Sequence, residues 1–163
     1  MYDAIDDPYT YDNSTVLVNR LDLRTQTELD AFEAEISTAR AEEPLPKGAL
    51  DFSHYKAVHH HLFQDVYDWA GQVRTVRISK GGNPFCFPEN IEGQAKVLFD
   101  DLHAAGFLRN LDTKTFSVKA AHFLAELNAI HAFREGNGRS QLTIASFAGD
   151  ESKLAAVIEG LIS

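Results

Sequence analysis

The sequence contains no apolar run long enough to span a membrane as a helix. Such a helix needs about 18 or more consecutive apolar residues, and every apolar stretch here is interrupted well before that length. The first residues also lack the basic and apolar blocks of a secretion signal. These two absences predict a cytoplasmic protein without a membrane partner, with a secreted effector as the alternative.

Cysteine and basic residues are scarce as well. Cys86 is the single cysteine, so the chain forms no internal disulfide, which is compatible with a reducing cytoplasm. There are 15 Lys and Arg residues against 24 Asp and Glu residues, the net charge is −9, and no basic stripe is present. This balance argues against nucleic acid as a partner, because phosphate neutralisation supplies most of such binding. The same balance does not argue against a mononucleotide as a ligand, since a mononucleotide needs only a few local donors.

The residues that are present suffice for one packed domain. The chain has 163 residues, 44% of them hydrophobic, and it includes 11 Phe. We therefore predict a single domain over residues 1–163, with 1–20 as an arm on its surface.

The spacing of apolar residues predicts a mainly α fold. The expected helices run from a capping box at 25–28 to just before Glu43, from 52 to 70, from Pro88 towards 105, and from about 113 to 130. Alternation over 72–79, a turn at 81–84 and a return over 85–87 predict a β-hairpin that covers 72–87.

The stretch His131-Ala-Phe-Arg-Glu-Gly-Asn-Gly-Arg139 follows the fourth helix directly. Its Gly-Asn-Gly permits positive φ at consecutive residues, so backbone N–H groups can gather in an anion-binding concavity. A helix starting near Arg139 would add its dipole, and Arg139 offers a fork of donors for phosphate. Glu135 is a hard ligand suited to Mg²⁺, and His131 accepts protons near neutral pH. The combination is typical of phosphoryl or nucleotidyl transfer.

An isolated Gly-Asn-Gly would be interpreted as a plain turn between helices, but the complete string is more specific. It resembles the signature of the Fic family, closest to the small bacterial Fic toxins. The resemblance extends to Asp7-Pro8-Tyr9, to 63–71 and to Ile78-Ser-Lys-Gly-Gly82. It implies a Fic-type helical domain whose short hairpin, the flap, lies next to the active-site loop at 131–139 and holds the target by strand addition. It also implies a bacterial protein adenylyltransferase (AMPylation) that moves AMP from ATP, with Mg²⁺, onto a Ser, Thr or Tyr hydroxyl of a target protein.

The resemblance implies a role for each residue of the loop. His131 would deprotonate the target hydroxyl, Phe133 would anchor the loop in the core, and Glu135 would position Mg²⁺. The α-phosphate would be held by the amides of Gly136 and Gly138 together with Asn137, and the outer phosphates by Arg139. The catalytic set implied in this way is His131, Asn137 and Arg139.

The resemblance also assigns the target-binding flap. Lys80, Gly81 and Gly82 would shape the hairpin, and Phe85 would press on the target side chain, with plain core packing of Phe85 as the equal alternative. Cys86 is interpreted as a small apolar filler.

Two positions depart from the family pattern. Ala132 stands where Pro is usual, which should loosen the loop slightly. Leu142 stands where many members carry a second Arg for the terminal phosphate, and we expect Leu142 to pack inward. Two alternatives therefore stay open: a catalytically weakened Fic-fold binding module, and a Fic enzyme that uses another nucleotide donor or removes AMP.

The chain has no Ser/Thr-x-x-x-Glu-Gly/Asn motif of the kind that inhibits many Fic proteins. The resemblance thus implies a toxin controlled by a separate small antitoxin that supplies an inhibitory glutamate, and it suggests a type II topoisomerase as target. A stripe resembling the family's closing helix follows soon after the loop, at Leu154, Val157, Ile158 and Leu161. Because so few residues separate the loop from this stripe, we predict that a segment is missing near 143–144.

The run His59-His60-His61 is not predicted to bind a metal. Neighbouring positions on a helix point about 100° apart, so three consecutive imidazoles cannot converge on one ion. We expect one packed and two more exposed rings.

Overall fold

Thr25 starts the first helix in the way the capping box predicts. In the computed structural model, which describes residues 4 and 6–149, α1 runs over Gln26–Glu42. The Thr25 hydroxyl accepts a hydrogen bond from the Glu28 backbone N–H at 3.3 Å and donates one to the Glu28 carboxylate at 2.7 Å. The first of these bonds satisfies one of the N–H groups that a helix start leaves without partners, and the second holds the Thr25 hydroxyl in place.

The remaining helices agree with the predicted periodicity except for the second one. The structure contains α2 (Phe52–Phe63), α3 (Pro88–Ala104), the 3₁₀ turn η1 (Gly106–Leu108), α4 (Thr113–Ile130) and α5 (Asn137–Ala145). Pro88 occupies the first turn of α3, as expected. The predicted extension of the second helix to residue 70 is wrong. The chain leaves the helix after Phe63 because α1 binds the next side chains: Arg40 holds Asp65 at 2.7 and 2.8 Å, and Glu33 binds the hydroxyl of Tyr67.

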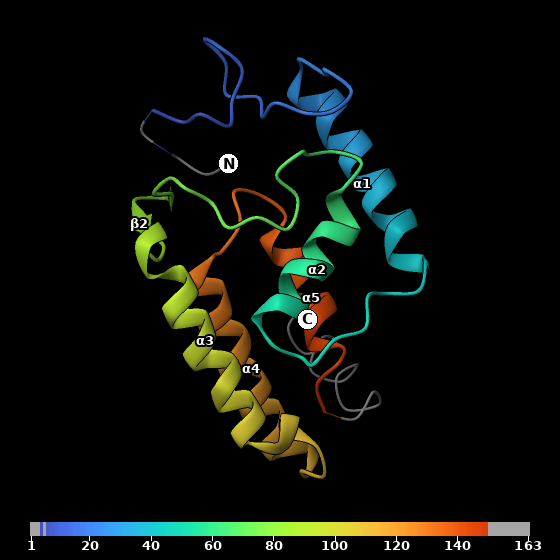
Figure 1. Cartoon of the computed structure of the whole chain (residues 1–163), viewed down its shortest axis with the longest axis vertical. Coiled ribbons are helices and arrows are strands. Elements are labelled where there is room, and N and C mark those ends of the chain that lie inside the picture. Colours follow the sequence, from blue (N-terminus) through green and yellow to red (C-terminus); the bar gives the residue numbers. More distant parts are fainter. Residues whose placement is uncertain (1–3, 5, 150–163) are drawn as a thin grey trace.

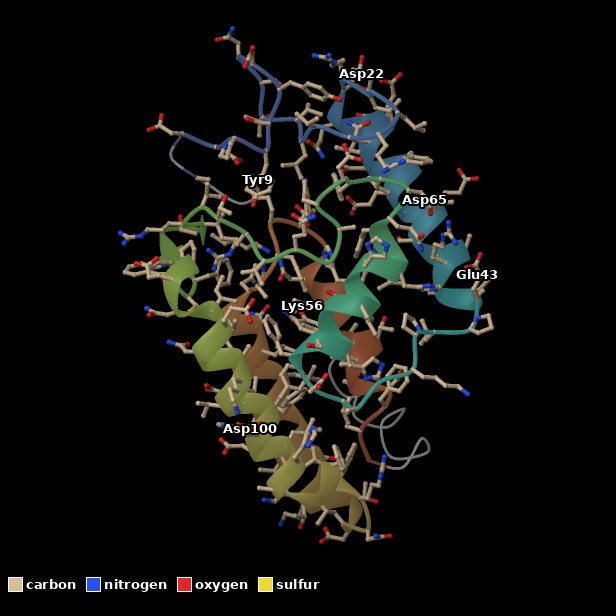
Figure 2. The ribbon with its side chains drawn as sticks, in the orientation of Figure 1. Tyr9, Asp22, Glu43, Lys56, Asp65 and Asp100 are labelled. Atoms are coloured by element: carbon tan, nitrogen blue, oxygen red, sulfur yellow. The ribbon has the colours of Figure 1, made fainter. Side chains whose placement is uncertain are left out.

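The helices form two groups that meet at the active-site loop. Figure 1 shows α3 and α4 side by side in the lower left, with the loop at the upper end of α4, while α2 lies against α5 and α1 flanks α2. Figure 2 shows Asp65 next to α1, where it meets Arg40. No helix in the described part of the chain is long and apolar enough to cross a membrane.

The flap hairpin is much shorter than predicted. Only β1 (Ser79–Lys80) and β2 (Asn83–Pro84) pair, antiparallel, around a two-residue turn at Gly81 and Gly82. Both glycines have positive φ, 57° and 78°, as a tight hairpin turn requires. The segment 72–78 was predicted as strand, but it forms no ladder, because its backbone and the buried Arg74 bind the loop after α4 instead. The return strand was likewise placed too late, at 85–87.

Where the structure describes the arm over 1–20, part of it is buried in the core and not only on the surface. Residues Thr10 and Leu17 form an isolated β-bridge, and Val16 and Leu17 are buried in the core. Tyr9 reaches the segment before the flap (Figure 2), and its hydroxyl accepts from the Thr75 backbone N–H at 3.0 Å. The arm therefore braces the same region that carries the loop.

Aromatic rings fill the centre of the domain beneath the loop. Tyr55, Phe63, Phe99 and Phe133 are fully buried, and the rings of Tyr55 and Phe133 lie 5.2 Å apart. Phe133 thus anchors the loop in the core, as predicted. The helix α5 continues without a break through 143–144, and the predicted closing helix lies outside the described residues.

Candidate active site

His131 ends α4 in a left-handed backbone conformation, with φ 50° and ψ 62°. The backbone N–H donates to the Leu127 carbonyl, and ring atom Nδ1 lies 3.0 Å from the carbonyl oxygen of Asn128. A carbonyl can only accept, so Nδ1 carries the proton and Nε2 of the neutral ring carries the lone pair. Asn128 therefore braces the ring through its backbone carbonyl.

The surroundings of His131 favour this neutral form. Burial lowers the pKa of the imidazole to about 4, the hydrogen bond that the ring donates to the Asn128 carbonyl acts in the opposite direction, and the positive charges of Arg74 and Lys80 lower the pKa further. A ring with this pKa is unprotonated at neutral pH and is able to accept a proton at Nε2.

Phe85 from the flap covers His131. Their rings stack at a centroid distance of 3.8 Å with 14° between the planes. Phe85 is half-buried, while Lys80, Gly81 and Gly82 at the tip of the flap are exposed. The predicted contact of Phe85 with a target side chain stays a prediction, and the described contact with His131 places it at the edge of the same site.

Gly136 is the one glycine of the loop that needs positive φ. Its φ is 79°, and a Cβ added there would lie 2.5 Å from Phe63. Gly138 has ordinary helical geometry inside α5, so the expected run of positive φ across Gly-Asn-Gly is wrong. Gly136 instead turns the chain directly into α5, whose first backbone N–H groups are of the kind that favour an anion.

The N-terminus of α5 offers backbone donors. None of the described side chains caps it, and the first N–H groups of a helix have no intrahelical acceptor. The N–H of Gly136 is held by the Glu135 carboxylate at 3.1 Å. The Asn137 side chain is fully buried and binds the Phe133 backbone on both sides, at 3.0 and 2.7 Å. Asn137 thus shapes the loop with its side chain, and its backbone N–H belongs to the donor set.

Glu135 borders a small polar cavity of about 230 Å³ between the loop, α1 and the arm. Asp30 and Glu33 from α1 share this cavity, and the described residues contain no group of three acidic, His or Cys side chains that could hold a metal on its own. Mg²⁺ commonly binds one or two carboxylates and completes its shell with substrate phosphates and water. The residues present fit that kind of site, in which Glu135 would be the protein ligand.

Arg139 extends from α5 to α1. Its Nη1 donates to the Ser37 hydroxyl and, at 3.4 Å, to the Glu33 carbonyl, while the Glu33 carboxylate lies 3.7 Å away. The side chain remains 47% exposed. Burial raises the pKa of Glu33, and the nearby charge of Arg139 opposes that shift. Arg139 is therefore oriented by α1 with part of its guanidinium open to solvent.

Arg74 is a residue of the site that the sequence did not reveal. Although 1% exposed, it donates to four carbonyls: His131 at 2.7 Å, Val76 at 2.7 Å, Cys86 at 2.5 Å and Ile130 at 3.2 Å. Burial lowers its pKa to about 10, so the guanidinium keeps its charge at neutral pH. It ties both sides of the flap to the backbone of His131.

His59 also contacts the loop. Its Nδ1 accepts from the Gly71 N–H at 2.8 Å, so Nε2 must donate to the Glu135 carbonyl, also at 2.8 Å. The ring stacks on Phe133 at 3.8 Å and is fully buried, while His60 is exposed. The expectation of one packed ring among the three histidines is confirmed, but its link to the loop was missed.

Leu142 is 44% exposed, so the expectation that it packs inward is wrong. The inward positions of α5 are taken by Ser140, Gln141, Ile144 and Ala145, and Leu142 faces away from them.

Cys86 is half-buried and burial raises the pKa of its thiol, in agreement with its interpretation as a small apolar filler.

Comparison with known proteins decides the family. The Fic/DOC family model matches residues 49–148. The chain belongs to the Fic/DOC family. It is 51% identical over 161 residues to the probable protein adenylyltransferase y4lH of Sinorhizobium fredii, an alignment that covers 94% of this chain and 84% of that protein. It is also 38% identical to the protein adenylyltransferase VbhT of Bartonella schoenbuchensis, over 85% of this chain and 30% of VbhT.

Solved structures confirm the Fic-type helical fold. The N-terminal Fic domain of a putative cell filamentation protein from Bartonella quintana, solved with bound ADP, superposes with a TM-score of 0.73 at 26% identity, over 86% of this chain and 76% of that one. The Fic domain of a Bartonella effector protein from Bartonella sp. AR 15-3 gives a TM-score of 0.78 at 24% identity, over 91% and 71%. The named relatives confirm the predicted enzyme class, because a protein adenylyltransferase is a nucleotidyltransferase.

Proposed function

We propose that this Fic protein transfers AMP from ATP to a Ser, Thr or Tyr hydroxyl of another protein, with Mg²⁺ as cofactor. The observation that carries the proposal is the state of His131. Its Nδ1–H donates a hydrogen bond to the Asn128 carbonyl, and burial keeps the ring neutral. The loop that leads into the N-terminus of α5 therefore carries a general base. The activity named for the relatives supports the same reaction.

Each residue of the loop has a separate role in the proposed transfer of AMP. Nε2 of His131 accepts the proton of the target hydroxyl while the hydroxyl oxygen bonds to the α-phosphorus, and pyrophosphate leaves as the old phosphorus–oxygen bond breaks. Backbone N–H groups at the start of α5 hold the α-phosphate oxygens. Arg139 would neutralise the outer phosphates, and Glu135 would hold the metal ion. When bound, Mg²⁺ supplies positive charge to the departing pyrophosphate.

The direct test uses ATP labelled in the α-phosphate. The protein is incubated with Mg²⁺, labelled ATP and bacterial lysate, beside His131→Ala and beside His60→Ala, which removes an exposed imidazole that contacts the Ala70 carbonyl. We expect protein-bound label with the wild type and His60→Ala, none with His131→Ala, and none when the label sits in the γ-phosphate. Labelling that survives His131→Ala contradicts the proposal.

Two alternatives give other outcomes in the same assay. A Fic enzyme with another nucleotide donor would be inhibited by that unlabelled nucleotide more strongly than by unlabelled ATP. A binding module would yield no label while still retaining its partner. The binding module is included because many family members carry a second Arg at the position of Leu142. In this chain the position holds an exposed leucine, which cannot bind a phosphate through charge.

The finer predictions rest on the family resemblance. They are a toxin role, a separate antitoxin that supplies an inhibitory glutamate, and a type II topoisomerase as the target. Labelling of purified topoisomerase subunits, with and without added Mg²⁺, checks both the target and the metal.

A further inference from the structure

An open groove of about 530 Å³ runs between α3 and α4. Its apolar lining consists of Val97, Leu98, Ala129 and Ile130. Ile130 directly precedes His131, and the Ala129 carbonyl accepts from the N–H of Cys86, at the base of the flap, at 3.1 Å. The groove therefore reaches the place where the flap and the catalytic loop meet, and Figure 1 shows the flap at the upper end of the α3 and α4 pair.

A glycine lines this groove. Gly93 lies in the middle of α3, lines the groove and is exposed. Glycine is among the least favourable residues for a helix interior. Its φ is not in the left-handed region, and a Cβ there would meet no described atom within 4 Å. Neither backbone geometry nor close packing thus calls for glycine at this position, and there is open space here for a larger side chain.

The polar lining of the groove is acidic. Glu89, Asp101 and Glu126 contribute carboxylates, His122 contributes an imidazole, and no Lys or Arg of the described residues lines it. Glu89 pairs with Arg77 of the flap segment at 3.2 Å. Asp101 and Glu126 form no ion pair with any other residue in the described part of the chain, and both are exposed. Val97, at 60% exposure, adds an apolar contact surface on the same face.

We propose that this groove is a docking site for a basic, partly apolar segment of the target protein, outside the target residue that receives AMP. The proposal rests on the proposed transfer of AMP to a protein. Opposite charge steers such a segment to the groove and fixes its register, and the apolar floor receives its apolar side chains. Because the groove ends beside His131, a docked segment brings the attached hydroxyl to the flap.

A second copy of this chain is a poorer occupant than a basic partner. The net charge of −9 means that two copies repel, and the carboxylates of the groove add to that repulsion. A nucleic acid is disfavoured for the same reason.

The test measures docking without catalysis. A short fluorescent peptide of Lys, Leu and Ser, and a matched peptide with Glu in place of Lys, are titrated by fluorescence anisotropy in the absence of nucleotide. Gly93→Leu fills the groove, and Gly93→Ala is its matched control. Glu126→Lys reverses a groove charge, and Glu35→Lys makes the same change at an exposed site on α1. Thermal unfolding checks that each variant folds.

We expect the Lys peptide to bind the wild type, Gly93→Ala and Glu35→Lys alike, and to bind Gly93→Leu and Glu126→Lys about tenfold more weakly or worse. Added salt should weaken the binding. Three results would overturn the proposal: no binding of the Lys peptide, equal binding to every variant, or equally tight binding of the Glu peptide.

Labelling with ATP separates the two proposals. His131-dependent labelling without groove-dependent peptide binding would remove the docking site and leave AMP transfer in place. Groove-dependent binding without any His131-dependent labelling would remove AMP transfer and leave the docking site.

Discussion

Asp7 and Arg134 lie 127 positions apart in the sequence, yet their side chains form a buried ion pair. One carboxylate oxygen of Asp7 accepts from Nε of Arg134 at 3.0 Å and from Nη2 at 2.6 Å. The two side chains are only 10% and 5% exposed. This pair fastens the N-terminal arm to the active-site loop, whose conformation therefore depends on residues far from it in the chain.

Replacing Asp7 with Ala should destabilise the protein strongly. The guanidinium of Arg134 would stay buried without its counter-charge, which typically lowers the free energy of unfolding by about 3–5 kcal/mol. Urea unfolding measures the loss. The double variant Asp7→Ala/Arg134→Met should recover part of it, because no unpaired charge remains. A loss under about 1 kcal/mol, the range of exposed pairs, would show that the pair is unimportant.

The two loop glycines should respond differently to alanine. Gly136→Ala meets both a left-handed backbone and Phe63 at 2.5 Å, so we expect a loss of at least about 2 kcal/mol in unfolding free energy. Gly138→Ala lies in a helical turn with no described atom near its Cβ, and alanine there should raise stability by up to about 1 kcal/mol. Slower His131-dependent labelling by a stable Gly138→Ala would place the phosphate against this turn. Equal stability losses in both variants would contradict the geometry.

The lowered pKa of His131 makes stability depend on pH. The folded ring has a pKa of about 4, below the unfolded value of 6.5, so the unfolded state binds more protons between these two values. Stability should therefore fall as the pH drops from 6.5 to 4. Subtracting the profile of His131→Gln isolates this contribution. NMR titration of the ring should show it neutral down to about pH 5, and a midpoint near 6.5 would contradict the described burial.

Leu142→Arg should strengthen nucleotide binding. Leu142 is 44% exposed and lies one turn after Arg139 on α5, so an arginine there needs no core rearrangement and adds a positive charge near the proposed phosphate site. Calorimetric titration with ATP and Mg²⁺ measures the change in affinity, and Leu142→Gln controls for the loss of leucine. An affinity equal to that of Leu142→Gln would place this side chain away from the phosphates.

Local sequence signals predicted much of the fold. The capping box at Thr25, the proline at the start of α3 and the apolar stripe of α4 each act within a few residues, so a pattern reveals them. The loop after α4 could be singled out for the same reason, since the residues proposed as phosphate donors, base and metal ligand are contiguous in the sequence. Fold and family were therefore accessible before the structure.

The remaining features depend on contacts between distant segments. Arg74 lies in a stretch whose alternating pattern predicted a strand. Its guanidinium instead binds the backbone carbonyls of Ile130 and His131. Bonds from a side chain to a distant backbone produce no periodic pattern in the sequence, so they could not be predicted from it. The bond from His59 to the Glu135 carbonyl is of the same kind. The outward position of Leu142 follows from where α5 begins, which is set by Gly136 against Phe63.

The most direct test of AMP transfer by His131 is the intact mass of a labelled target. The protein is incubated with ATP and Mg²⁺, a labelled target band is purified, and its mass is compared with that from a His131→Ala reaction. The proposed chemistry predicts a gain of one AMP group on a Ser, Thr or Tyr residue with the wild type and no gain with His131→Ala. An unchanged mass, a gain of phosphate alone, or the same gain with His131→Ala would contradict it.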